Sequence, residues 1–137
     1  MAAVDHLPPA WRGSILTVDD CPTTRAWMAA VLEARGWRVQ AVDNGADALE
    51  AARSTHFDAI VLDVEMPGID GLALGRALRG DPRTARTCIA MHSGLDEAQV
   101  RAGFCQYDAF VPKSGQPLAL GERVEQMLRA AAEATAA

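Results

Sequence analysis

The chain has 137 residues, half of them hydrophobic, and a formal net charge of −5. This length and composition predict a single domain with a substantial core and argue against a disordered chain. The acidic balance argues against a nucleic-acid surface, which is usually basic. No apolar run approaches the ~20 residues that span a bilayer, and the first residues lack the pattern of a secretory signal. We therefore expect neither a nucleic-acid nor a membrane partner.

The three cysteines, Cys21, Cys88 and Cys105, form neither a Cys-x-x-Cys pair nor an even set. This usage is typical of a reducing compartment, so we expect a cytoplasmic location. Cys88 lies in an apolar run and is expected to be a small buried hydrophobe. Cys21 directly follows two acids, whose charges should raise the pKa of its thiol and limit its reactivity.

The first part of the chain predicts a strand, a helix and a second strand. Residues 1–13 are a polar lead-in, and Ser14–Asp19 is apolar enough for a strand buried on both faces. Pro22 suits the first turn of a helix that ends at Gly36, a natural C′ residue. The segment Trp37–Val42 alternates apolar and polar residues, which predicts a half-exposed strand at a sheet edge.

The middle of the chain predicts a third strand between two helices. The turn Asp43-Asn44-Gly45 is expected to cap a helix over Ala46–Ser54, and the strand Asp58–Asp63 follows. The glycines Gly68 and Gly71 are interpreted as turn residues before the next helix.

The last third predicts two further strand and helix pairs. Their expected ranges are Cys88–Met91, Asp96–Ala102, Ala109–Val111 and Leu118–Ala131. Residues 131–137 have high helix propensity but no large apolar side chain, so we expect a frayed tail and place the domain at residues 14–130.

Alternating strands and helices predict an α/β fold whose parallel sheet is covered on both faces. In such sheets ligands bind beyond the carboxyl ends of the strands. Polar residues follow four of these ends, namely Asp19 with Asp20, Asp63, Ser93 and Lys113. Three adjacent carboxylates oppose one another's ionisation unless a cation compensates, and oxygen ligands suit Mg²⁺. The pattern therefore predicts a Mg²⁺ site at this edge.

Taken together, these motifs resemble the response regulator receiver domain of two-component signalling, of the stand-alone chemotaxis-regulator type. The resemblance covers residues 14–128 and rests on five motifs in the family's order and spacing. They are Asp19-Asp20, Asp63, the loop Met66-Pro67-Gly68-Ile69-Asp70-Gly71, Ser93 and Lys113. The resemblance implies a doubly wound, five-stranded parallel sheet in the flavodoxin-like order 2-1-3-4-5.

The resemblance also implies a function for each of these residues. Asp63 would be the phosphoryl acceptor, and Asp20 the main metal ligand, with Asp19 assisting through water. The backbone carbonyl of Glu65 would face the same ion. The phosphoryl group would be contacted by Ser93 and Lys113, and Phe110 would be the aromatic residue that turns inward on activation.

Three features depart from the family pattern. Ser93-Gly94 replaces the more usual Thr-Ala, and this should make the switch less sharply two-state. Lys113 is followed by Ser114 instead of proline, so we expect a trans bond there. Pro112 before it is compatible with an edge strand.

The carboxylate of Glu65 would tune the lifetime of the phosphoryl group, and the alternative is an ordinary solvated loop acid.

No segment after the last helix could serve as an effector domain, so we expect the output to be a protein contact. The expected contact surface includes Arg101, Phe110 and Gln116. The resemblance implies a histidine kinase or histidine phosphotransferase upstream and an unidentified protein downstream, with a monomer or weak dimer. Whether the chain delivers the final output or relays the phosphoryl group stays open.

Two other functions are considered. An aspartate-nucleophile phosphohydrolase uses similar parts, but its nucleophile usually begins an Asp-x-Asp pair on the first strand, which this chain lacks. A module that is never phosphorylated is disfavoured by the complete set of acid, hydroxyl and lysine. We therefore expect a signalling domain and not an enzyme.

Overall fold

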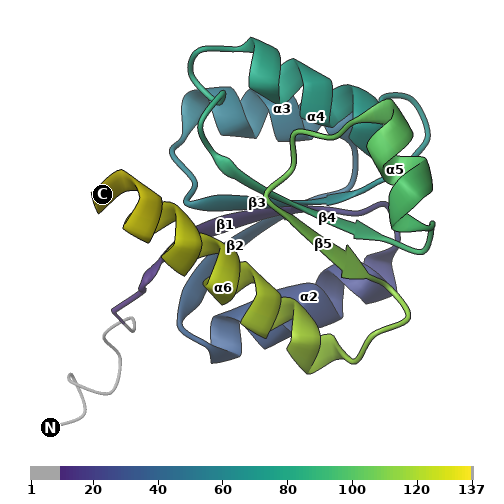
Figure 1. Ribbon diagram of the computed structural model, residues 1–137. Helices are drawn as coiled ribbons and strands as arrows, with labels where there is room; N and C mark the ends of the chain where they lie inside the picture. Colours follow the sequence, from purple (N-terminus) through teal and green to yellow (C-terminus); the bar gives the residue numbers. More distant parts are fainter. Residues whose placement is uncertain (1–9, 137) are drawn as a thin grey trace, which may run out of the picture.

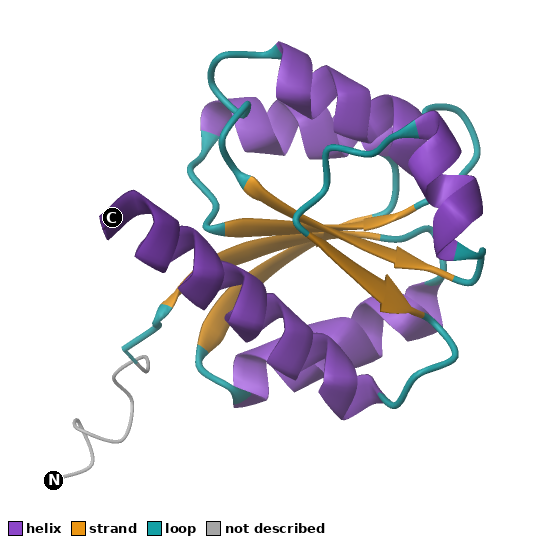
Figure 2. Cartoon of the chain, viewed as in Figure 1, coloured by secondary structure: helices purple, strands orange, loops and turns teal. Residues whose placement is uncertain are grey.

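The computed structural model describes residues 10–136, and the lead-in before residue 10 lies outside this range. Five strands form one sheet with every neighbouring pair parallel, in the order β2-β1-β3-β4-β5. The strands are β1 (Gly13–Val18), β2 (Trp37–Val42), β3 (Ala59–Asp63), β4 (Cys88–Ser93) and β5 (Ala109–Pro112). The predicted fold class and strand order are confirmed (Figures 1 and 2).

Five helices cover the two faces of this sheet. They are α2 (Pro22–Ala34), α3 (Gly45–Ser54), α4 (Gly71–Gly80), α5 (Glu97–Gly103) and α6 (Pro117–Ala136). Helices α3, α4 and α5 lie on one face, and α2 and α6 lie on the other (Figure 1). None of these helices, within the part of the chain that the structure describes, combines the length and apolar character needed to cross a bilayer.

Two cores lie on opposite faces because successive side chains of a strand point in opposite directions. Leu16 and Ile60 contribute to the core under α3, α4 and α5. Their neighbours Ile15 and Val61 contribute to the core under α2 and α6. The central strands β3 and β4 are buried along their whole length, in agreement with the apolar runs at residues 59–62 and 88–91 that precede their polar carboxyl ends.

The edge strands also agree with the sequence pattern. Trp37 of β2 is buried while Arg38 and Gln40 are exposed, as the alternation predicts for an edge. At the other edge, Pro112 closes β5 and is exposed, so its missing N–H removes no ladder bond within the sheet. All peptide bonds of the described residues are trans, which confirms the expectation for Lys113–Ser114.

Two glycines have distinct reasons to be glycine. Gly36 has φ +95°, the left-handed conformation expected of a residue that ends a helix. Gly68, with φ +77°, agrees with its interpretation as a turn residue, but Gly71 is the first residue of α4, so the same interpretation is wrong for Gly71. A Cβ at position 71 would lie 2.0 Å from the carbonyl oxygen of Asp63, because α4 begins directly against the end of β3.

The end of the chain departs from the predicted frayed tail. Helix α6 continues to Ala136, beyond the expected end near Ala131. Alanine has the highest helix propensity, and Ala131 packs against the core under α2 and α6. The hydroxyl of Thr135 donates to the carbonyl of Ala131 at 3.0 Å, which supports the last turn.

An ion cluster joins the start of the described chain to α6. Glu125 is buried, yet its carboxylate is paired with both Arg12 and Arg35. These two arginines outweigh the effect of burial and lower the pKa of Glu125. Arg12 also lies over the Trp37 ring, 4.8 Å from its centroid, so the segment before β1 is tied to the domain.

Candidate functional site

Three carboxylates meet at the carboxyl edge of the sheet. Asp19 and Asp20 follow β1 and Asp63 ends β3, its neighbour in the sheet. One oxygen of each lies within 4.8 Å of the others. Asp19 and Asp63 are buried, at 0% and 3% exposure, whereas Asp20 is exposed. The predicted meeting of the acids is therefore observed, with one of the three facing solvent.

Lys113 completes this cluster from the loop after β5. Its ammonium Nζ lies 2.9 Å from Asp63 Oδ1 and 3.1 Å from Asp19 Oδ2. The backbone positions it, because Lys113 N donates to the carbonyl of Ser93 at 2.8 Å. Burial alone would lower the pKa of Lys113, but the two acids outweigh it and raise that pKa. Lys113 is thus a fixed positive charge beside Asp63.

The cluster remains short of positive charge even with Lys113 in place. Burial raises the pKa of Asp63, the hydrogen bond from Lys113 offsets part of this, and the charge of Asp19 adds to it. Asp19 Oδ2 is buried and pairs with the same ammonium group at 3.1 Å, so one ammonium group serves two buried carboxylates while Asp20 lies beside them. Three carboxylates with a single ammonium group, all of them oxygen ligands, fit a hard divalent cation such as Mg²⁺.

Local contacts hold Asp19 in this position. Its Oδ1 accepts from the Cys21 backbone N–H at 2.9 Å, and its carbonyl accepts from Arg25 Nη1, also at 2.9 Å. The sequence analysis missed Arg25. The available signal was a cation one turn into the helix that follows the acid pair, where a long side chain can reach back over the turn.

Cys21 corrects one prediction. It is exposed at the N-cap of α2, and the pKa of its thiol is lowered, not raised. A hydrogen bond with the Thr24 side chain is the main cause, and the backbone N–H groups of Thr24 and Thr23 add to it. These contacts outweigh the charge of Asp19. Cys88 is buried, as expected.

Ser93 ends β4 beside the acids and is buried. Its Oγ accepts from the Leu95 backbone N–H at 3.0 Å, so the hydroxyl hydrogen stays available to donate. His92 lies next to it in the strand, paired in register with Asp63. His92 is buried with its ring edge-on to Trp27, and burial lowers its pKa to about 4.

The remaining predicted site residues lie around this cluster. Glu65 is exposed in the loop that follows Asp63, and Gln116 is exposed before α6. Phe110 is half-buried against the core under α3, α4 and α5. Tyr107 lies between Phe110, whose ring centroid is 6.3 Å away, and Arg101, whose guanidinium is 5.9 Å from the Tyr107 ring. Phe110 and Arg101 thus belong to one surface.

This arrangement can support phosphoryl transfer to a carboxylate. Asp63 offers a nucleophilic oxygen, and Lys113 offers a cation beside it. The free hydroxyl hydrogen of Ser93 can meet an oxygen of the transferred group. Charge on the equatorial oxygens of such a group requires nearby cations and donors.

Comparison with known proteins agrees with the fold. The family model of the response regulator receiver domain matches residues 15–125, so this chain belongs to that family. The transcriptional activator protein PfeR of Pseudomonas aeruginosa is 37% identical over 117 residues, which cover 84% of this chain and 37% of PfeR. The chain therefore spans well under half of the length of that relative.

Two solved structures show the same likeness. The receiver domain of a signal transduction histidine kinase from Syntrophus aciditrophicus is 32% identical, with a TM-score of 0.79. That match covers 86% of this chain and 91% of the other. The response regulator TrrA of Thermotoga maritima, solved in complex with Mg²⁺ and BeF, is 29% identical with a TM-score of 0.77. It covers 84% of this chain and 98% of TrrA.

Proposed function

We propose that this receiver domain accepts a phosphoryl group on Asp63 from the phosphohistidine of a histidine kinase or histidine phosphotransferase. The observation that carries the proposal is the ion pair between Asp63 and Lys113 inside a cluster of three carboxylates. Membership of the receiver family supports it. We also propose a location in the cytoplasm, because such donors act there and because three unpaired cysteines are typical of a reducing compartment.

In the proposed reaction, an oxygen of Asp63 forms a bond to phosphorus as the phosphorus–nitrogen bond of the donor breaks. The electron pair stays on the imidazole nitrogen, which then takes up a proton. Lys113 lies where it can pair with an oxygen of the transferred group. The buried position of Asp63 limits water around the acyl phosphate that forms.

We propose Asp19, Asp20, Asp63 and the backbone carbonyl of Glu65 as the residues that would hold Mg²⁺. When bound, Mg²⁺ supplies positive charge that neutralises the oxygens of the phosphoryl group. Asp20 is the exposed member of the set, so it can exchange its water for the ion at the smallest cost. The Mg²⁺ complex of TrrA supports this part of the proposal.

Ser93 and Lys113 would distinguish the phosphorylated state from the free one. The hydrogen bond that the Ser93 hydroxyl donates would be stronger to a charged phosphoryl oxygen than to a neutral acceptor. Lys113 would gain an additional anionic partner. Two groups with a differential preference can shift a two-state equilibrium. The exposed carboxylate of Glu65, two residues past Asp63, would then influence the approach of water and the lifetime of the phosphoryl group.

The output would be a protein contact on the surface around Arg101, Phe110 and Gln116. Tyr107 joins the first two through its ring, so a change at Phe110 can reach the exposed face of α5. In this proposal the chain turns over only its own phosphoryl-aspartate, as a signalling domain and not as an enzyme acting on a small substrate. The partner surface is open to test by substitution at Arg101.

The test is transfer from a phosphohistidine donor in the presence of Mg²⁺, followed by intact mass. We expect one phosphoryl group on the wild-type chain and none on Asp63→Asn. Asp58→Asn is the matched control, because Asp58 lies just before β3, at the opposite end of the same strand. Equal labelling of wild type and Asp63→Asn would overturn the proposal, and so would loss of labelling in Asp58→Asn alone.

A further inference from the structure

Asp20, just after β1, is held close to two other acids without a partner of its own. One of its carboxylate oxygens lies within 4.8 Å of oxygens of Asp19 and Asp63. Lys113 pairs with those two acids but not with Asp20, which forms no ion pair with any residue between 10 and 136. Because the neighbouring charges repel it, an exposed carboxylate would turn toward water if its backbone were free to move. The backbone at Asp20 must therefore be fixed by other contacts.

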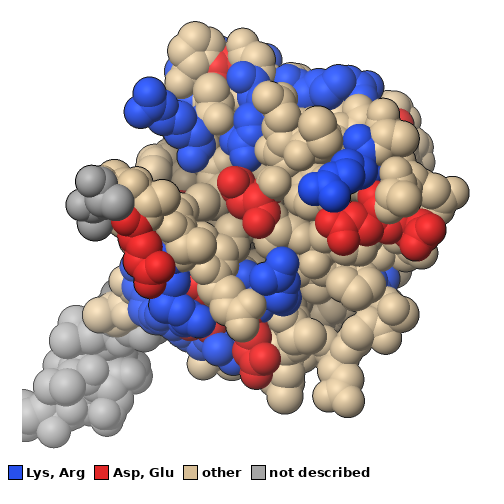
Figure 3. Space-filling model, in the orientation of Figure 1, with Lys and Arg blue, Asp and Glu red and all other residues tan. Residues whose placement is uncertain are grey.

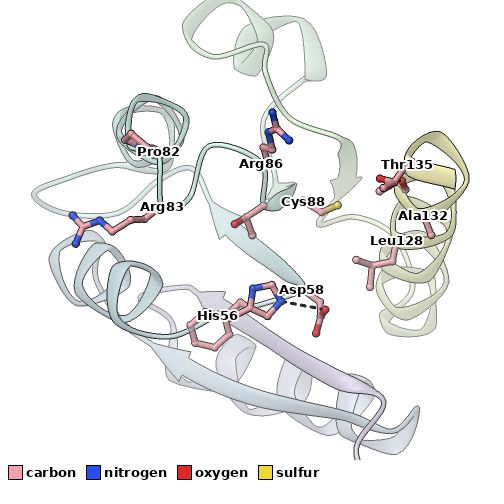
Figure 4. Close-up of a pocket in the computed structure, with 12 residues that line it drawn as sticks. His56, Asp58, Pro82, Arg83, Arg86, Cys88, Leu128, Ala132 and Thr135 are labelled. Atoms are coloured by element: carbon pink, nitrogen blue, oxygen red, sulfur yellow. Dashed lines mark hydrogen bonds and ion pairs between the residues drawn. The ribbon is translucent and has the colours of Figure 1, made fainter. Parts of the chain in front are cut away.

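The acid at the opposite edge of the sheet is held in a different way. Asp58 has partners at the carboxylate itself, because its Oδ2 accepts from the Ser14 backbone N–H at 2.8 Å and its Oδ1 lies 3.5 Å from His56 Nε2. Figure 4 shows the side chains of His56 and Asp58 directed toward one another beside the cavity at this edge. Asp20 lacks such partners, so its position depends on the peptide group that precedes it.

Three hydrogen bonds fix the residue before Asp20. The N–H of Asp19 donates to the carbonyl of Val42 at 3.2 Å, and Asp19 Oδ1 accepts from the Cys21 N–H at 2.9 Å. The carbonyl of Asp19 accepts from Arg25 Nη1, also at 2.9 Å. Of the three bonds, this last one acts directly on the peptide group that joins Asp19 to Asp20. Rotation of that group would change the direction of the Asp20 side chain.

Arg25 directs its guanidinium at a neutral group. Basic side chains extend from several parts of the surface drawn in Figure 3, whereas the Arg25 side chain is half-buried. Its backbone is held by the first turn of α2, where its N–H donates to the carbonyl of Cys21 at 3.0 Å. Asp19 is fully buried, so its carbonyl requires a donor, and Arg25 supplies one. The carboxylate oxygens of the acid pair thus remain available to a cation.

We propose that Arg25 is a positioning residue for the Mg²⁺ site, an inference that rests on the proposed function. Its hydrogen bond fixes the peptide group between Asp19 and Asp20, and so keeps the Asp20 carboxylate beside Asp63 before an ion arrives. Ligands that are already in place bind an ion more tightly, because less conformational freedom is lost on binding. Contacts that orient a ligand typically change metal affinity by roughly 10–100-fold.

The positive charge of Arg25 has the opposite effect on a cation. Loss of the hydrogen bond should weaken Mg²⁺ binding, whereas loss of the charge should strengthen it. Salt separates the two effects, because in about 0.5 M KCl charges more than about 4 Å apart are largely screened. A change in Mg²⁺ affinity that persists at this salt concentration reports the hydrogen bond.

The test is a titration of the whole chain with MgCl₂ in this salt, followed through the amide NMR signals of Asp20 and Asp63. We expect Arg25→Ala to bind Mg²⁺ about tenfold more weakly than wild type. Arg25→Lys keeps the charge but has a shorter side chain, so its affinity should lie between the two. Arg129→Ala is the matched control with unchanged affinity, because it removes an exposed arginine from the second half of α6.

The Mg²⁺ affinity separates positioning from stability. A variant that is only less stable binds Mg²⁺ with unchanged affinity while it is folded, and amide signals outside the site show whether Arg25→Ala is folded. Equal or tighter binding by Arg25→Ala would overturn the role of Arg25 and leave the proposed function intact. An equal loss in Arg129→Ala would also overturn it. A wild-type chain that binds no Mg²⁺ would overturn the proposed metal site together with this inference.

Discussion

The ammonium group of Lys113 lies 2.9 Å from the carboxylate of Asp63, although β4 separates their strands in the sheet. Lys113 is the only lysine of the chain, and every other basic residue that counts toward the net charge is arginine. A compact ammonium group can lie between Asp63 and Asp19 where a wide, planar guanidinium would need more room. Lys113 thus brings a positive charge from the end of β5 to the two buried carboxylates.

Removal of this ammonium group should destabilise the domain. We expect Lys113→Met to lower the free energy of unfolding at pH 7 by about 1–2 kcal/mol, because two buried carboxylates lose their partner. The loss is smaller than for a fully buried pair, since the Lys113 side chain is 30% exposed and solvent screens it. Urea unfolding without Mg²⁺ measures it. A variant as stable as wild type would show that the ion pair contributes nothing.

Mg²⁺ should stabilise the protein through Asp20. Because Asp20 is exposed, we expect Asp20→Asn to change the metal-free stability by less than about 0.5 kcal/mol. Wild type should gain stability in proportion to the logarithm of the Mg²⁺ concentration, and the variant should gain almost none. Thermal unfolding across a MgCl₂ titration gives both numbers. Equal gains in the two proteins would exclude Asp20 as a ligand. The same titration with CaCl₂ is the control for the identity of the ion.

His92 should make stability depend on pH. Burial lowers its pKa to about 4 from the ordinary 6.5, so between these values the unfolded chain binds a proton that the folded chain does not. Stability should therefore fall as the pH decreases from about 6.5 towards 4. We expect His92→Gln to lose less stability over this range than wild type, and His56→Gln, at an exposed histidine, to behave like wild type. Parallel pH profiles for wild type and His92→Gln would contradict this account.

Gly71 should be intolerant of a side chain. A Cβ there would meet backbone atoms of Asp63 and Val64, which cannot move aside without shifting the end of β3. We expect Gly71→Ala to cost about 1–3 kcal/mol and to slow phosphorylation of Asp63. Gly80→Ala is the control, since nothing lies within 4 Å of its Cβ. If both variants unfold at the same urea concentration, the close approach of Gly71 to the end of β3 does not affect stability.

The sequence predicted the sheet because its strands carry unambiguous patterns. The continuous apolar run before Asp63 predicted a strand, and the alternation that begins at Trp37 predicted an edge strand. The site residues were predictable for the same reason, since parallel strands bring their carboxyl ends to one edge. Which acid is buried was not predictable, because Asp19 and Asp20 are neighbours in sequence and differ only in the direction of their side chains.

Local contacts account for what the sequence did not predict. Cys21 was expected to respond to neighbouring charge, but a helix N-terminus and Thr24 dominate its surroundings. His92 is buried, and its Nδ1 has no hydrogen-bond partner among the described residues, which its place beside Ser93 in the sequence does not reveal. The extension of α6 depended on packing of Ala131, which composition alone does not reveal. These features depend on contacts between particular side chains, which periodicity does not encode.

The position of the phosphoryl group tests the central claim most directly. The chain would be incubated with Mg²⁺ and a small acyl phosphate, then digested, and the modified residue located by tandem mass spectrometry of the peptides. The account predicts modification at Asp63 alone, and no modified peptide from Asp63→Asn. A phosphoryl group on Asp19, Asp20 or Glu65 of the wild-type chain, with Asp63 unmodified, would contradict it.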